Sequence, residues 1–201
     1  MPKYAIALLL LSITTPATAQ APATSPAPRV AIETTHGTFT VELDAVRAPL
    51  TAENFLRYVR DGAYDGTAFH RVIANFVVQG GGYDTELRER TSRAAIANES
   101  GNGLSNRRGT LGLAREENPH SGSSQFYVNL VDNLGLDPLP SRWGYAVFGR
   151  VVEGMEVLDR IAHLRTETVG SLGSDVPVDR PAIKRAWVVN EPAPPAPAPA
   201  Q

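Results

Sequence analysis

The chain has 201 residues, of which 42% are hydrophobic and 20% are charged, and its formal net charge is −2. This length allows one domain with a sizeable core, and the composition is ordinary for a soluble globular protein. The small net charge and the lack of a basic patch argue against a nucleic-acid partner. Cysteine is absent and the histidines lack metal-ligand spacing, so we expect no disulfide, no thiol nucleophile, no metal and no cofactor.

Residues 1–19 have the pattern of a secretory signal peptide. Lys3 supplies a positive start, residues 5–13 form an apolar run too short to span a bilayer, and residues 17–19 form an A-x-A cleavage sequence. A Thr-Thr-Pro break argues against the alternative, a buried N-terminal helix. The sequence therefore predicts a periplasmic protein, or a secreted one if the source lacks an outer membrane. No later stretch approaches membrane length, so we expect no membrane insertion.

Two segments rich in proline and alanine flank the predicted domain. They are a linker over residues 20–28 and a tail over residues 191–201. Little apolar bulk and many prolines predict extended, disordered chain. The tail is interpreted as a spacer, and a ligand for a proline-binding groove is the alternative. The folded domain is predicted to span residues 29–190.

The domain begins with a predicted hairpin and a helix. Residues 30–33 and 39–43 alternate apolar and polar side chains, and His36-Gly37 between them indicates a turn. Residues 51–60 carry apolar side chains at i, i+3, i+4 and i+7, which predicts an amphipathic helix.

The run F-H-R-V-I-A-N-F-V-V-Q-G-G-G, which begins at Phe69, is the densest group of β-forming residues in the chain. Strand alternation places Phe69, Arg71 and Ile73 on one face, and the Ala-Asn pair predicts a turn before the strand resumes. Arg71 is then held on a rigid sheet near Phe76 and Gln79. A lone arginine is more often a solvated strand residue, but the aromatic and carboxamide neighbours favour a functional site.

The second half of the domain is predicted to contain more strands. Residues 88–108 form a polar loop in which Asn98-Glu99-Ser100 fits a glycosylation sequon, and Trp187 in the last strand is expected in the core. The predicted elements are strands at 110–114, 125–130, 145–152 and 183–189, and a helix at 155–164.

The strand pattern predicts the fold class. The strands are short, mostly adjacent, and lack the regular βα alternation of a parallel sheet. Eight antiparallel strands can close into a barrel filled by their own side chains, with two helices over the open ends. We therefore predict a mainly β fold: a closed eight-stranded antiparallel barrel capped by two α-helices.

The run from Phe69 resembles the signature of the cyclophilin family of peptidyl-prolyl cis-trans isomerases, F-H-R-x-I-x-x-F-x-x-Q-G-G, and fills all of its fixed positions. Residues 124–127 and 145–149 match the family in the same order and spacing, and the resemblance covers roughly residues 29–189. It implies the same barrel with an active site on its outer surface. It also implies an enzyme, without a covalent intermediate, that binds proline-containing polypeptides, and we expect a monomer.

The chemistry of an X-Pro bond explains why an arginine suits this reaction. Isomerisation is slow because the amide must lose its resonance, and the twisted prolyl nitrogen gains a lone pair. A donor aimed at that nitrogen stabilises the transition state more than the planar ground states. Arginine is a rigid, permanently charged donor. The resemblance implies that Arg71 is this catalytic donor.

The resemblance also implies the residues that bind substrate. Gln79 would orient Arg71 and contact the substrate carbonyl, Tyr145 would border the pocket, and Gln125 with the Ala114-Arg115 backbone would bind the residues before proline. The pocket that receives the proline ring would be lined by Phe76, Val77, Tyr127 and Leu136.

The chain departs from many family members at several of these positions. Val77 replaces Met, Tyr127 replaces Phe and would add a hydroxyl at the pocket wall, and Arg115 replaces Asn. Gly135 stands where animal members have Trp, and Tyr145 where they have His. In the family this Trp is linked to binding of the immunosuppressant cyclosporin, so the resemblance implies weak cyclosporin binding here. Other loop motifs are similar to bacterial members, which agrees with the predicted periplasmic location.

The sequence is compatible with three functions to different degrees. The favoured one is a prolyl isomerase that assists the folding of exported proteins. The alternative is a proline-binding chaperone or scaffold module with little turnover. A serine hydrolase built on Ser121, Ser123 or Ser124 with His120 is disfavoured because no G-x-S-x-G elbow is present.

Overall fold

The computed structural model describes residues 27–189 and 191. The predicted signal peptide, most of the linker and nearly all of the tail lie outside the described residues. Within the described part, eight antiparallel strands form one sheet in the order β10-β1-β2-β7-β5-β6-β4-β3. These strands are β1 (Arg29–Thr34), β2 (Gly37–Leu43), β3 (Arg71–Ile73), β4 (Val77–Gly80), β5 (Thr110–Leu113), β6 (Phe126–Asn129), β7 (Val147–Glu153) and β10 (Ile183–Val188).

The sheet is curled but open, so the prediction of a closed barrel is confirmed only in strand number and direction. Its two ends are β10 and β3, which share no ladder in the described structure. Between the segments that precede them, Ala68 and Ala182 form an isolated bridge, and the Ile183 amide donates to the Thr67 carbonyl at 2.8 Å. Phe69, which was predicted on the same face as the partly exposed Arg71, is fully buried in the core, and β3 begins only at Arg71.

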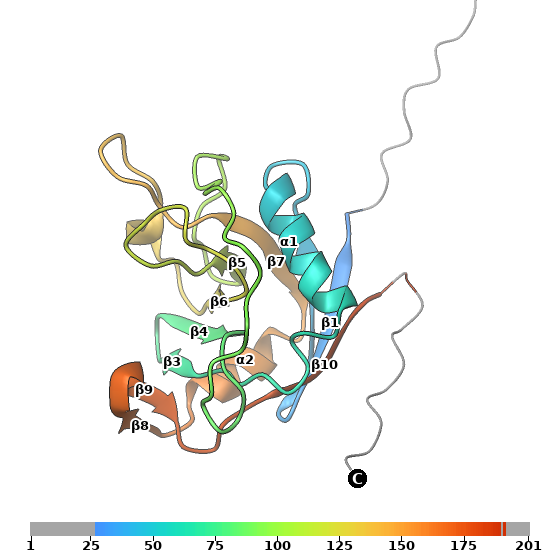
Figure 1. Cartoon of the computed structure of the whole chain (residues 1–201), viewed down its shortest axis with the longest axis vertical. Coiled ribbons are helices and arrows are strands. Elements are labelled where there is room, and N and C mark those ends of the chain that lie inside the picture. The colour runs from blue at the N-terminus through green and yellow to red at the C-terminus, as the bar shows by residue number, and fades with distance from the viewer. Residues whose placement is uncertain (1–26, 190, 192–201) are drawn as a thin grey trace, which may run out of the picture.

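The first and last strands along the chain, β1 and β10, are neighbours in the sheet. Val30 pairs with Val188, and the amide of Val189 donates to the carbonyl of Arg29 at 2.8 Å. Figure 1 shows β1 and β10 together on one side of the molecule, with β3 and β4 on the other.

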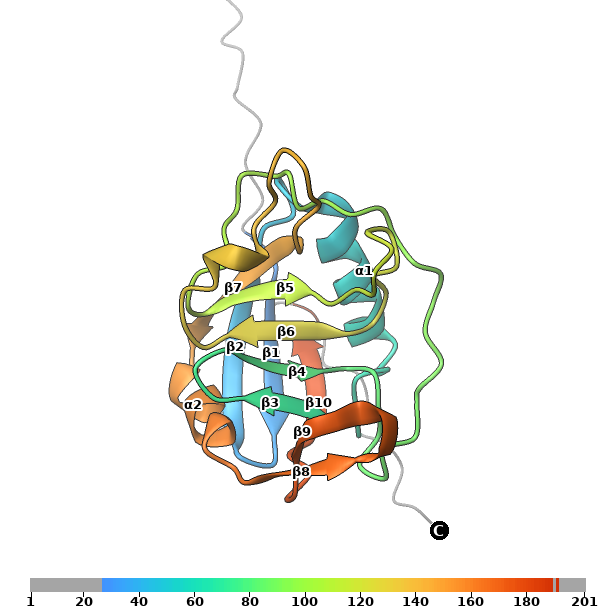
Figure 2. The same ribbon diagram turned by 90° about the vertical axis from the view of Figure 1, so that its left-hand side faces the viewer.

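Two helices, α1 (Pro49–Arg60) and α2 (Met155–Ala162), lie on opposite sides of the curled sheet (Figure 2). The predicted apolar stripe of α1 is buried, and its Phe55 ring lies 5.1–5.3 Å from the rings of Tyr64, Phe126 and Phe148. The helix begins two residues before the predicted start. The carboxylate of Glu99 accepts hydrogen bonds from the Leu50 and Thr51 amides, and so caps the helix from a distant loop.

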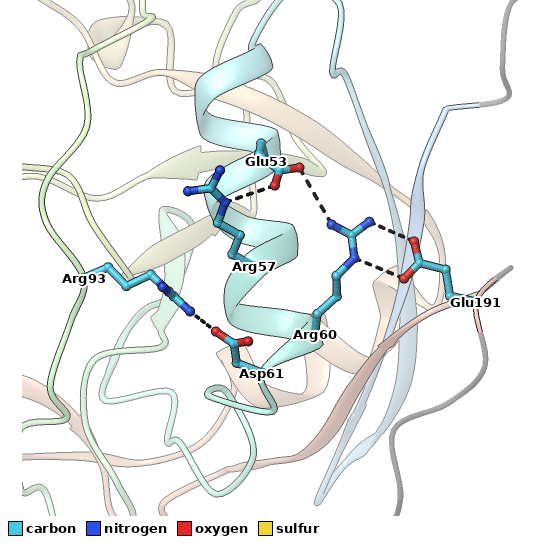
Figure 3. Close-up of polar contacts among 6 residues, drawn as sticks. All are labelled: Glu53, Arg57, Arg60, Asp61, Arg93 and Glu191. Carbon is cyan, nitrogen blue, oxygen red and sulfur yellow. Dashed lines mark hydrogen bonds and ion pairs between the residues drawn. The ribbon is translucent and has the colours of Figure 1, made fainter.

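The outer face of α1 carries a group of ion pairs (Figure 3). Arg57 pairs with Glu53 at 3.0 Å, and Arg60 pairs with Glu191 at 2.8 Å. Exposed pairs of this kind contribute about 0–1 kcal/mol each. These pairs mark the solvent-exposed face of α1 and contribute little to its stability.

The sequence did not predict a second, two-stranded sheet. Strands β8 (Thr166–Val169) and β9 (Gly173–Pro177) are joined by a short 3-10 helix, η2 (Gly170–Leu172), and another, η1 (Leu134–Leu136), precedes β7. The hairpin is largely exposed, so it lacks the apolar alternation that reveals a strand. Trp187 is half-buried rather than in the core, and Arg185 stacks on its ring.

Within the described residues, neither α1 nor α2 is long and apolar enough to cross a membrane.

Candidate active site

Four residues form a row across the open end of the sheet. Arg71 on β3 is opposite Gln79 on β4, Gln79 is opposite Tyr127 on β6, and Tyr127 is opposite Gly112 on β5. Directly opposite residues point to the same face. A Cβ on Gly112 would lie 2.1 Å from Cζ of Tyr127, so the ring occupies the space that the glycine leaves. Strand register thus places a cation, a carboxamide and an aromatic ring side by side.

The polar side chains of this face form a hydrogen-bonded chain. Arg71 Nη1 donates to Gln79 Oε1 at 3.2 Å, and Gln79 Nε2 donates to Gln125 Oε1 at 2.9 Å. The guanidinium carbon lies 6.0 Å from the centre of the Phe76 ring. The side chain of Arg71 remains 37% exposed, so it is held in place yet accessible to a ligand.

The predicted apolar residues come to the same face from four segments. Val77 and Tyr127 are buried, whereas Phe76, Leu136 and Tyr145 are half-buried. The Tyr145 amide donates to the Leu136 carbonyl at 2.9 Å, and its ring packs edge-on against Tyr127 at 6.0 Å. The structure therefore brings the predicted lining together, with three of its five residues accessible.

The hydroxyl of Tyr127 corrects one detail of the sequence-based prediction. We expected it at the pocket wall, but it lies behind the wall and donates to Asn106 Oδ1 at 2.7 Å. Asn106 is fully buried, accepts from Asn129 at 3.2 Å, and donates through its side chain to Asp137 at 2.8 Å. Burial raises the pKa of Tyr127 well above its usual value, so the phenol stays a neutral donor.

The network ends at the carboxylate of Asp137, which accepts from Asn106 and lies at the start of the loop before Tyr145. Burial alone would raise its pKa, but hydrogen bonds from Ser105 and Asn106 lower it below the usual value. The carboxylate therefore stays ionised and holds the loop. Neither Asn106 nor Asp137 was predicted as part of the site, since their spacing in the chain gives no signal of this contact.

The side chain of Arg115 holds two loops together through contacts within the protein. Its guanidinium carbon lies 4.5 Å from the centre of the Tyr145 ring. Its nitrogens donate to backbone carbonyls of Glu116, Glu117, Trp143 and Gly144. Only the backbone of Ala114-Arg115 was predicted to bind substrate. The Ala114 amide donates to the Gln125 carbonyl at 3.0 Å, which places this backbone beside Gln125.

A polar hollow of about 250 Å³ adjoins the site at Gln125 and Ala114. Gln125 packs on Gly82, where a Cβ would lie 2.6 Å from its Cδ. Arg90 and Ser121 also line the hollow. Gln125 therefore connects the row that contains Arg71 with this polar hollow.

His70 is buried next to Arg71, with its ring 4.7 Å from that of Tyr83. Its Nδ1 atom has no hydrogen-bond partner in the described structure. Burial, with a smaller effect from the charge of Arg71, lowers the pKa of His70 to about 4. The ring is therefore neutral at pH 7 and adds no charge to the site.

Two other sequence patterns lie within residues 98–121: the glycosylation sequon and the possible serine–histidine pair. The side chains of both form hydrogen bonds within the protein. His120 Nδ1 accepts from the Asn98 amide at 3.1 Å, and Ser121 Oγ donates to the Asn118 carbonyl at 2.7 Å. Neither bond joins the serine hydroxyl to the histidine ring, as a serine nucleophile and its general base would require. The Asn98 carboxamide of the sequon donates to two backbone carbonyls, so it has a structural role.

Comparison with known proteins agrees with this geometry. The family described as "Cyclophilin type peptidyl-prolyl cis-trans isomerase/CLD" matches residues 29–188. The chain belongs to the cyclophilin family of peptidyl-prolyl cis-trans isomerases. The predicted enzyme class is thereby confirmed, and the mainly β cyclophilin fold with two helices is the fold observed here.

Individual cyclophilins of this family are similar over most of the chain. A peptidyl-prolyl cis-trans isomerase of Acinetobacter baylyi is 48% identical over 70% of this chain and 75% of its own. Peptidyl-prolyl cis-trans isomerase A of Dickeya dadantii is 39% identical over 95% of this chain and 100% of its own. The crystal structure of a Cryptosporidium parvum cyclophilin in the presence of the dipeptide Ala-Pro is 27% identical, with a TM-score of 0.64, and covers 81% of this chain and 99% of that chain.

Proposed function

We propose that Arg71 catalyses the rotation of X-Pro bonds by donating a hydrogen bond to the prolyl nitrogen in the twisted transition state. The observation that carries this proposal is the bond from Arg71 to Gln79, which fixes a half-exposed guanidinium beside the apolar lining. The twisted nitrogen has a lone pair that the planar amide lacks. A donor placed there lowers the barrier more than it stabilises either ground state.

The size of the effect requires more than one hydrogen bond. A ~10⁵-fold acceleration needs about 7 kcal/mol. One charged hydrogen bond contributes about 1.5–3 kcal/mol. The remainder is assigned to holding the peptide in a water-poor pocket, where Phe76, Leu136 and Tyr145 cover the proline ring. No nucleophile or proton transfer is required.

The residues before proline would bind along Gln125 and the backbone of Ala114-Arg115. Gln125 is linked to Arg71 through Gln79, so binding there is coupled in position to the donor. The hollow beside Gln125 gives room for side chains that precede the proline. The Ala-Pro dipeptide present with the Cryptosporidium parvum protein is a ligand of the same chemical class.

The test is isomerisation of an Ala-Pro test peptide by the wild type, Arg71→Ala and Arg71→Lys. We expect Arg71→Ala to lose at least about a hundredfold in kcat/KM, as expected when a charged transition-state donor is removed, and Arg71→Lys to recover little because lysine lacks the rigid fork. Arg150→Ala is the matched control, since Arg150 is a strand arginine in an ion pair with Glu42. Circular dichroism checks folding.

Two outcomes would contradict the proposal. Full activity of folded Arg71→Ala would remove Arg71 from the mechanism. A wild type that binds the peptide but isomerises it slowly would favour the alternative function, a proline-binding module with little turnover. Val77, Tyr127 and Arg115 would then be the first positions to change to Met, Phe and Asn, the residues of many family members.

We further propose that the protein acts on exported polypeptides. The support is the signal-like pattern of residues 1–19, which lies outside the described residues. The full chain expressed in a Gram-negative host should be found in the periplasm with Gln20 as its first residue. Leu9→Arg with Leu10→Arg should retain it in the cytoplasm at full length. A full-length cytoplasmic wild type would contradict export.

A further inference from the structure

The hairpin of β8 and β9 packs against β3, the strand that carries Arg71 (Figure 2). From β9, Asp175 Oδ2 lies 3.8 Å from Nε of Arg71. Its other oxygen, Oδ1, accepts from Ser174 Oγ at 3.2 Å. The carboxylate is thus held on its own strand while it faces the cation on the neighbouring one.

Arg71 is therefore approached on three sides. Gln79 accepts from Nη1, the Phe76 ring lies 6.0 Å from the guanidinium carbon, and Asp175 faces Nε. Arginine has many rotamers, and a side chain that is 37% exposed is not confined by packing alone. Contacts on the Nε and Nη1 sides select one orientation of the planar group and leave the Nη2 side for another partner.

We infer that Asp175 is a positioning residue, which fixes the Nε side of Arg71 so that its Nη2 side faces the prolyl nitrogen. This inference rests on the proposed role of Arg71 as the donor. Asp175 would not touch substrate. It would act through the orientation of the guanidinium, so its effect belongs to the chemical step and not to peptide binding.

The competing explanation is that Asp175 only stabilises the hairpin or the surface. The same hairpin provides a control for this. Glu167 on β8 pairs with Arg180 at 2.6 Å and is not among the contacts of Arg71. Both carboxylates are partly exposed and both pair with an arginine. Glu167→Gln and Asp175→Ala therefore remove similar charges, and only one of them removes a contact with Arg71.

The experiment measures kcat and KM separately for the wild type, Asp175→Ala, Asp175→Asn and Glu167→Gln. We expect Asp175→Ala to lower kcat about two- to fivefold, the range for an exposed ion pair, with KM changed less than about twofold. Asp175→Asn keeps an acceptor for Nε and should recover part of the loss. Glu167→Gln should leave both constants unchanged. Urea unfolding of each variant measures any general loss of stability.

Two further readouts separate positioning from a structural role. Because an exposed pair is screened by salt, wild-type kcat should fall toward that of Asp175→Ala between about 10 mM and about 0.5 M sodium chloride, while the variant stays constant. In an Arg71→Ala background, Asp175→Ala should have no further effect on rate.

An unchanged or increased kcat for Asp175→Ala, or a decrease equal to that of Glu167→Gln, would overturn the inference. These results are distinct from a failure of the proposed function. That failure would appear as full activity of Arg71→Ala itself, whatever the variants at Asp175 do.

Discussion

The two walls of the candidate site are held in place by different interactions. The strand wall consists of β3, β4 and β6, where backbone ladders set Arg71, Gln79 and Tyr127 opposite one another. The loop wall consists of residues 114–123 and 132–145. It is held by individual side chains, chiefly Asn106 and Arg115, that bond to backbone groups or to Asp137.

This difference determines which mutations should matter. A ladder survives the loss of one side chain because its hydrogen bonds belong to the backbone. A loop held by a few side chains loses its position when one of them is removed. The loop wall should therefore be the more sensitive to substitutions that never touch substrate.

The largest effect is expected where the loop wall depends on one buried residue. Asn106→Ala would remove a partner from each of Tyr127, Asn129 and Asp137, and a buried group left unpaired costs about 1–3 kcal/mol. We expect the free energy of unfolding to fall by about 2–4 kcal/mol in urea titrations. Asn118→Ala, at an exposed loop asparagine, is the control. Equal unfolding midpoints for the two variants would contradict the comparison.

Next to the strand wall, the buried His70 directly before β3 should make the stability of the protein depend on pH. Burial lowers the pKa of His70 to about 4 in the folded state, against about 6.5 when unfolded. Its contribution to stability is complete above pH 6.5 and is lost as the pH falls toward 4, because only the unfolded state gains the proton. The slope is about 1.4 kcal/mol per pH unit.

Urea titrations at about pH 7 and about pH 4.5 measure this slope. His70→Phe should lose about 2 kcal/mol less than the wild type between these two pH values. Its isomerase activity at pH 7 should be nearly unchanged, since the ladders still place Arg71. An identical pH dependence in both proteins would show that His70 does not titrate as described.

A moderate effect is expected at Arg115. Arg115→Ala would remove the bonds to four loop carbonyls and the contact with Tyr145. We expect KM for the test peptide to rise about three- to tenfold, since loop-wall groups that bind the peptide become less ordered. Arg47→Ala, which removes an exposed pair with Asp44 outside both walls, is the control and should leave KM unchanged. An unchanged KM for Arg115→Ala would mean that the loop wall keeps its position without it.

The smallest effect on the enzyme itself is expected at Gly135 in the loop wall. This residue is exposed in η1, and a Cβ added there would meet no atom within 4 Å. Gly135→Trp should therefore fold with little loss of stability and keep its activity. The family resemblance predicts that it binds cyclosporin more tightly than the wild type. Calorimetry measures both affinities, and tight binding by the wild type would contradict the prediction of weak binding.

The sequence was sufficient to predict much of the strand wall. The motif from Phe69 and the alternation around Gln125 led to the strands, to the turn at Asn75 and to Arg71 beside Gln79. Asn75 has φ of 59°, a left-handed conformation that asparagine tolerates. Local patterns carry this information because strands and turns depend on neighbouring residues.

The loop wall and the ends of the sheet could not be predicted in the same way. The contact of Asn106 with Tyr127 joins residues 21 positions apart through a buried hydroxyl. The place of Asp175 depends on a hairpin without apolar alternation. The predicted closure of the barrel is not observed, since β10 and β3 share no ladder in the described structure, and pairing between segments so far apart in the chain leaves no local sequence pattern.

The pairing of β1 with β10 has a consequence for how the domain can be connected to other chains. The carbonyl of Arg29 accepts from the amide of Val189, so the chain enters and leaves the fold at almost the same point. A linker of a few residues would join these points, and new ends could be opened at the Thr35-His36 turn without cutting a strand. A circular permutant of this kind should keep its catalytic face. Cargo proteins joined directly at Arg29 or at Val189 would therefore be attached at neighbouring points, on the opposite side of the molecule from β3 and β4 (Figure 1).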